Sequence, residues 1–129
     1  MGTRAVVARP TPQGFTGRIF LNDGTPGTAV AVLRGFVLNV QEGDVEAAAR
    51  VLIDDHPGGW IDVPDPDCRG RCLCHDAPPI NGPASTEPTT EQTASEAEYV
   101  YVLHPERLAV LAPGGDGWEE IGSTPWWSD

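Results

Sequence analysis

The chain has 129 residues and a formal net charge of −11 at pH 7, with eight Lys and Arg residues against 19 Asp and Glu. This length accommodates one domain, and the sequence contains no run of 18 apolar residues that could span a membrane. Because contacts to phosphate need clustered cations, the acidic balance argues against direct nucleic-acid binding.

The charge is unevenly distributed along the chain. Residues 1–41 carry four Arg against one Asp, a balance of +3, whereas residues 42–129 carry 18 acidic residues against four Arg, a balance of −14. An acidic surface permits a basic protein partner or mimicry of a nucleic acid, and it also keeps a small protein in solution. The opening MGTRAVVARP lacks the apolar stretch of a signal peptide, so we expect a cytoplasmic protein whose thiols stay free or bind metal.

Residues 1–63 are predicted to form a hairpin and a pair of helices. Residues 5–8 and 15–21 are strand-like, and the intervening Thr11-Pro12-Gln13-Gly14 has the Pro and Gly of a type I turn. Asp44 is a suitable N-cap for a helix over residues 45–55. Apolar residues at helical spacing predict one helix over 28–40 (Val30, Leu33, Val37, Val40) and mark the buried stripe of the next (Val45, Ala48, Ala49, Leu52).

The second half of the chain is predicted to contain an insertion and a second hairpin. Residues 60–63 are consistent with a short strand, and residues 77–97 are rich in Pro, Ser, Thr and Glu, which cannot bury enough apolar surface to offset the entropy of ordering. Residues 99–103 and 107–111 are β-rich and predict a hairpin. Trp126 and Trp127 either pack in the core or anchor a partner.

These elements predict one α+β domain. Its four-stranded antiparallel sheet, made of two hairpins, is covered on one face by two helices and carries a metal-binding knuckle and a flexible insertion. The parts are residues 1–63 (first hairpin and helix pair), 64–76 (Cys/His knuckle), 77–97 (flexible acidic insertion) and 98–129 (second hairpin and Trp-rich tail).

The three cysteines lie within seven positions, and this clustering predicts a zinc site at Cys68, Cys72 and Cys74. Zinc in structural sites takes four tetrahedral thiolate or imidazole ligands. The fourth ligand is His75, which makes the site local, or alternatively His56. The neighbouring arginines favour the thiolate form that zinc requires. Four protein ligands leave no open position, so we expect a structural zinc.

Other interpretations of the cysteines remain open. The spacing C-x3-C-x-C-H is not a common zinc-finger pattern, and three clustered cysteines also resemble iron–sulfur spacings. Free thiols are the other alternative, because an odd number of cysteines cannot form a complete disulfide set.

Asp54-Asp55-His56 is the second candidate site. Two carboxylates in the last turn of a helix oppose the helix dipole, which favours cations there. An unfavourable local arrangement can indicate a metal-binding or general-base site, and the ordinary interpretation is an exposed acidic helix end.

Five segments of the chain are similar to segments of a known group of proteins. The first three are Met1-Gly2-Thr3-Arg4, Asn22-Asp23-Gly24-Thr25-Pro26 and Gly43-Asp44-Val45-Glu46. The other two are Asp54 to Trp60 and Tyr101-Val102-Leu103-His104-Pro105. Together they resemble small uncharacterised proteins of GC-rich bacteria and their phages that start with Met-Gly-Thr-Arg. The resemblance implies a compact domain and implies no activity.

The sequence therefore predicts a non-enzymatic, zinc-stabilised protein-interaction module with an unknown protein partner, which the acidic charge of the chain allows to be basic. One alternative is an acidic phage or host-defence antagonist that mimics a nucleic acid or binds a basic protein. Another is a small metal-dependent hydrolase that uses Asp54, Asp55 and His56.

Overall fold

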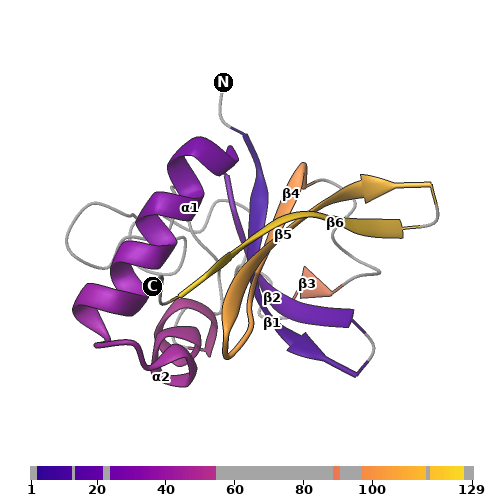
Figure 1. Ribbon diagram of the computed structural model, residues 1–129. Coiled ribbons are helices and arrows are strands. Elements are labelled where there is room, and N and C mark those ends of the chain that lie inside the picture. Colours follow the sequence, from indigo (N-terminus) through magenta and orange to yellow (C-terminus); the bar gives the residue numbers. More distant parts are fainter. Residues whose placement is uncertain are drawn as a thin grey trace, which may run out of the picture.

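A six-stranded mixed sheet forms the centre of the molecule, and both helices lie on one of its faces (Figure 1). The structure is a computed structural model that describes residues 3–12, 14–21, 24–54, 89–90, 97–115 and 117–126. The strand order is β3-β2-β1-β4-β5-β6. The strands are β1 (Ala5–Thr11), β2 (Gly14–Phe20), β3 (Thr89–Thr90), β4 (Tyr99–Leu103), β5 (Arg107–Gly114) and β6 (Gly117–Pro125).

Both predicted hairpins are confirmed, but the way they join is not the expected one. β1 pairs with β2, and β4 with β5, in antiparallel fashion. The hairpins are joined by parallel pairing of β1 with β4, in which Ala5 lies opposite Tyr99. The expectation of a four-stranded, wholly antiparallel sheet is therefore wrong. β4 starts beside the first residue of β1 and runs in the same direction.

Two strands were not predicted. β6 contains few large apolar or β-branched residues, and its polar side chains are mostly exposed, so it lacks the usual strand signal. β3 lies inside the expected flexible insertion, where Thr89 and Thr90 pair with Gly17 and Thr16 of β2. The predicted strand over residues 60–63 and the predicted metal-binding knuckle over residues 64–76 lie outside the described residues.

The helical regions occur where the apolar periodicity predicts them. α1 (Pro26–Gly35) begins two residues earlier than expected, because Pro26 suits the first helical turn. It continues as a π-helical turn, η1 (Phe36–Val40). α2 (Val45–Ala49) continues into a second one, η2 (Arg50–Asp54). The predicted cap is confirmed, since the Asp44 carboxylate accepts a 3.0 Å hydrogen bond from the Ala47 N–H.

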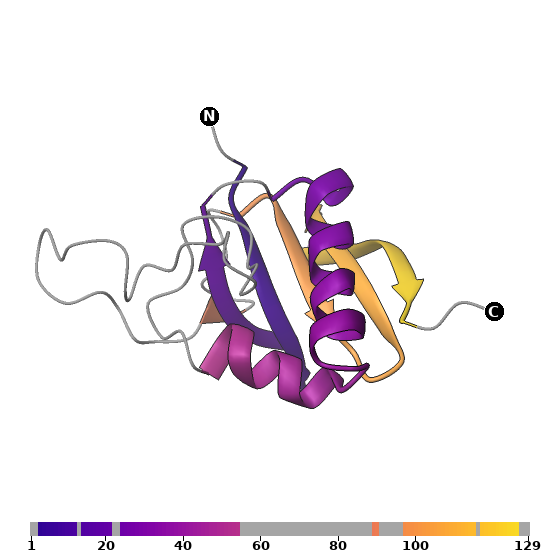
Figure 2. The ribbon, with the colours of Figure 1, turned by 90° about the vertical axis from the view of Figure 1, so that its left-hand side faces the viewer.

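The helices cover one face of the sheet (Figure 2), and the large side chains of that face are buried beneath them. Leu33 and Val37 from the first helical region, and Ala48, Ala49 and Leu52 from the second, are buried as their spacing predicts. They pack against alternate strand residues, which include Phe20, Tyr101 and Leu108. This layer is the main hydrophobic core, and no helix in the described part of the chain is long and apolar enough to span a membrane.

Trp126 closes this core at the end of β6. Its side chain is fully buried, and its indole N–H donates a 2.6 Å hydrogen bond to the carbonyl of His104. The Arg34 guanidinium of α1 donates to the carbonyls of Pro125 and Trp126, at 3.1 and 3.2 Å. Of the two interpretations of the tryptophan pair, core packing is therefore confirmed for Trp126, and Trp127 lies outside the described residues.

Candidate binding pocket

The sheet face opposite the helices is concave, because the ends of the two long hairpins curl toward each other. Phe15 lies near the tip of the β1–β2 hairpin and Trp118 near the tip of the β5–β6 hairpin. Three strands separate β2 from β6 in the sheet order. Their rings nevertheless meet edge to face, with centroids 6.2 Å apart and planes at 78°. An irregularity in the β5–β6 register at Val110 and Leu111 contributes, since a bulge bends its strand and increases the local twist.

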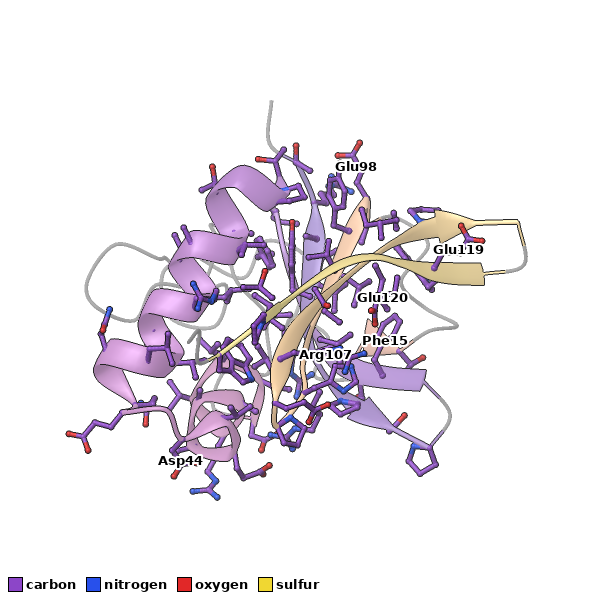
Figure 3. The ribbon with its side chains drawn as sticks, viewed as in Figure 1. Phe15, Asp44, Glu98, Arg107, Glu119 and Glu120 are labelled. Carbon is purple, nitrogen blue, oxygen red and sulfur yellow. The ribbon has the colours of Figure 1, made fainter. Side chains whose placement is uncertain are left out.

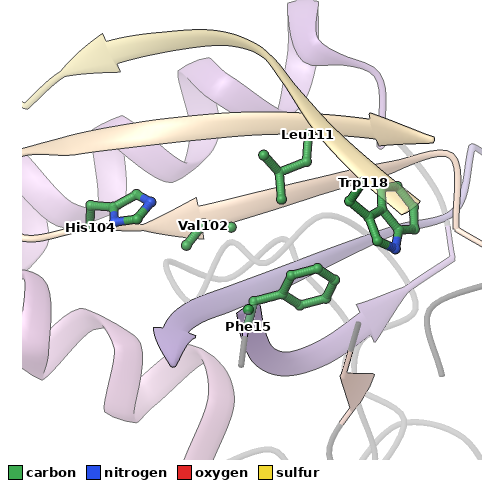
Figure 4. Close-up of a pocket in the computed structure, with 6 residues that line it drawn as sticks. Phe15, Val102, His104, Leu111 and Trp118 are labelled. Atoms are coloured by element: carbon green, nitrogen blue, oxygen red, sulfur yellow. The ribbon is translucent and has the colours of Figure 1, made fainter. Parts of the chain in front are cut away.

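This concave face holds a pocket of about 240 Å³ (Figure 4). His104 lies at one end and Trp118 at the other, with Val102, Leu111 and Phe15 between them. The walls are therefore aromatic and aliphatic, and the imidazole is the only ionisable group among the described lining residues. The lining residues are Gly14, Phe15, Val102, His104, Leu111 and Trp118.

Strand alternation explains why these side chains meet. Successive residues of a strand point to opposite faces, so Val102 points into the concave face while its neighbours Tyr101 and Leu103 pack under the helices. Leu111 and Trp118 pack against the same small cluster on the concave face. Gly14 has a φ of 135°, which other residues rarely adopt, and this permits the tight turn that brings Phe15 to the pocket.

The backbone of His104 is held by three hydrogen bonds. Its N–H donates to the carbonyls of Arg107 and Val102, at 3.0 and 3.2 Å, and its carbonyl accepts from the indole of Trp126. Desolvation, together with the charge of Arg107, lowers the pKa of the His104 imidazole, against a smaller opposing effect of Glu106 and Glu120. The imidazole is therefore neutral at pH 7 and can both donate and accept a hydrogen bond.

Three charged side chains lie close enough to His104 to influence its pKa; we call them the charged rim (Arg107, Glu106 and Glu120). The Arg107 guanidinium lies 2.8 Å from a carboxylate oxygen of Glu120, its neighbour in Figure 3. The guanidinium also lies 3.2 Å from a carboxylate oxygen of Glu106. Glu120 is the cross-strand partner of Leu111 and lies two residues from Trp118, so its side chain leaves the sheet on the concave face. With one cation and two anions, the rim has a net charge of −1 while His104 is neutral.

A second, smaller hollow lies on the other side of the sheet. It has a volume of about 200 Å³ and lies between α2 and the β4–β5 turn, with Glu46, Ala49 and Pro105 among its lining residues. Arg9 borders it, and its guanidinium is committed to Asp54 at 3.0 Å. Both members of this ion pair are partly exposed, so it contributes little to stability.

Of the residues that the sequence analysis proposed as metal ligands or catalytic groups, the structure describes one, Asp54. Asp54 ends η2 and pairs with Arg9 of β1, a cation contributed from a distant strand, so an acidic side chain at this helix end has a structural explanation. Asp55, His56 and the predicted zinc ligands Cys68, Cys72, Cys74 and His75 lie outside the described residues. Within the described ranges, no group of three or more His, Cys, Asp or Glu could hold a metal ion.

Sequence reasoning missed the pocket itself. His104 was placed in a hairpin turn, and Phe15 and Leu111 in strands, without the inference that they share a face. Strand alternation along 100–104 could have placed Val102 and His104 together. Trp118 could not be placed, because β6 was not predicted. Comparison with protein-family models, with curated proteins and with solved structures finds no match to this chain.

Proposed function

We propose that this protein is a non-enzymatic protein-interaction module that holds one large, apolar-bodied side chain of a protein partner in the pocket on the concave face. The observation that carries the proposal is the pocket itself, with Trp118 at one end, His104 at the other and Phe15 between them. Aromatic residues around a well-packed pocket are typical of binding hot spots.

The volume of the pocket favours a side chain over a larger ligand. A cavity of about 150 Å³ accommodates benzene, whereas sites for drug-sized ligands and cofactors occupy about 300 to 1,000 Å³. At about 240 Å³, this pocket lies between the two and fits one large side chain. Its chemistry also favours binding, because the described lining residues include no Ser, Thr or Cys nucleophile, and the carboxylates that act on His104, Glu106 and Glu120, are paired with Arg107.

Zinc remains part of the proposal as a structural element. Cys68, Cys72 and Cys74 with His75, or with His56 in its place, would hold the ion, and the support is their spacing in the sequence. Metal analysis after purification without chelator should find one zinc per chain. Cys72→Ser should lose the metal and lower the melting temperature, because binding at such a site is coupled to folding. A metal-free, stably folded protein with three titratable thiols would contradict this part.

The pocket is tested with single-residue probes, the N-acetyl amides of leucine and tryptophan. Burying one large apolar side chain supplies about 3 kcal/mol at best, which corresponds to a Kd of about 6 mM or weaker. Saturable shifts of the Phe15 and Leu111 amide resonances, which are present in the wild type and in Trp118→Ala alike, should report binding in this range in NMR titrations. We expect Trp118→Ala to weaken binding at least about tenfold, since it removes one wall.

Ile121→Ala is the matched control for this experiment. Ile121 lies on the same strand, and its side chain is 57% exposed, outside the pocket. Its removal should leave the probe affinities unchanged. Absence of saturable shifts in the folded wild-type protein, or equal losses in the two variants, would reject the proposed function.

A further inference from the structure

The pocket offers an apolar surface and its charged rim offers carboxylates, and one natural side chain can contact both. The interior is aromatic and aliphatic, and the rim beside it carries Glu120 and Glu106. An arginine side chain has an apolar stem and a planar cationic head, so it can lie along apolar surface and still present its charge to a carboxylate. Its guanidinium also stacks on aromatic rings, of which tryptophan is the most favourable.

The charges of the rim favour a cation over an anion. Arg107 is already neutralised by two carboxylates, which leaves a net charge of −1, and the whole chain carries −11. The Glu120 side chain is 43% exposed. A carboxylate has about four lone-pair sites, so Glu120 can accept hydrogen bonds from a second guanidinium while it keeps Arg107.

We propose that the pocket selects an arginine side chain of a basic protein partner, with the stem of that side chain against Val102 and Leu111 and its guanidinium between Trp118 and Glu120. This inference rests on the proposed function and adds the chemistry of the partner. It also explains why the site has both apolar walls and a carboxylate, because an aliphatic ligand would need no carboxylate beside Leu111.

Binding of a cation is then coupled to the protonation of His104. The charged groups that face this imidazole are Arg107 and Glu106 from the β4–β5 turn and β5, and Glu120 from β6, while β2 contributes the uncharged Gly14 and Phe15. Protonation of His104 would raise the local net charge from −1 to 0. The affinity for an arginine probe should therefore fall as the pH drops below the ordinary histidine range, while the affinity for a leucine probe stays constant.

The test compares the N-acetyl amides of arginine and of citrulline, which has nearly the same shape and no charge. At low salt, the wild-type protein should bind the arginine probe roughly three- to tenfold more tightly, as expected for one partly exposed charge contact with an aromatic neighbour. Glu120→Gln should reduce the arginine affinity to that of citrulline and leave citrulline binding unchanged.

Glu119→Gln is the matched control, because it removes the same charge from the adjacent residue of β6, whose side chain packs over Gly114 on the other face. It should preserve the preference for arginine. Equal binding of arginine and citrulline, or loss of the preference in both variants, would overturn this inference and leave the proposed function standing. Absence of binding by arginine, citrulline and leucine probes alike would overturn both.

Discussion

The two faces of the sheet are built from different side chains, and the difference separates stability from binding. Under the helices, large residues such as Phe20, Tyr101 and Trp126 are fully buried, and the hollow of about 200 Å³ on that side lies between α2 and the β4–β5 turn. On the concave face, the buried residues are mostly small, such as Ala8, Val100 and Ala109, and the large rings among the described residues there, Phe15 and Trp118, lie where the hairpin tips meet. The pocket stays open because its floor consists of small side chains and the aromatic rings lie at its margin.

The largest expected effect is the loss of a tryptophan from the helix-covered face. Trp126→Ala should destabilise the protein by about 3 to 5 kcal/mol, since it removes a fully buried ring and leaves a cavity. Trp118→Ala should cost less than half as much, because this side chain is only partly buried, at the margin of the concave face. Urea unfolding of the two variants measures the contrast, and equal losses would break the distinction between the faces.

Enlarging one buried valine on each face gives the next largest contrast. Val7 and Val102 lie on neighbouring strands and point to opposite faces. Val7→Leu should cost about 1 to 3 kcal/mol, because it overpacks the filled core. Val102→Leu can extend into the pocket, so its stability should change by less than about 0.5 kcal/mol while it weakens probe binding. The reverse ranking in denaturant unfolding would contradict this account.

A change that loosens a helix should leave the pocket unaffected. Asp44→Ala removes the cap of α2 and should cost about 1 kcal/mol. Because α2 packs on the opposite face of the sheet, the affinities for the leucine and arginine probes should stay within twofold of wild type, as measured by the same NMR titration. A large loss of affinity would show that the faces are energetically coupled.

The smallest expected effect is on the pH dependence of stability. Burial and Arg107 hold the pKa of His104 below its ordinary value of 6.5, so the unfolded chain takes up this proton at a higher pH than the folded chain does. Stability is therefore lost as the pH falls from 6.5 toward the folded pKa. We therefore expect the free energy of unfolding, measured with urea, to fall less in His104→Gln than in the wild type between about pH 7.5 and about pH 5.5. An equal loss in both proteins would contradict the assigned shift.

Local sequence signals were sufficient for the elements and insufficient for their assembly. The turn at Thr11–Gly14, the Asp44 cap and the stripe through Leu33 and Val37 each depend on neighbours in sequence, and these elements are present where expected. The parallel pairing of β1 with β4 and the curl that joins Phe15 to Trp118 depend on distant contacts. No local pattern encodes such contacts, so the pocket could not be predicted. The zinc site stays a prediction.

The central claim is that the concave face is the binding surface, and shift mapping tests it most directly. Amide and indole resonances are followed while the arginine and leucine probes are titrated into the wild-type protein. The account predicts saturable shifts confined to the pocket, at Phe15, His104, Leu111 and Trp118, with Leu33 of α1 and Ala49 of α2 unchanged. Shifts centred on the helix-covered face, or no saturable shift at the pocket of a folded protein, would contradict it.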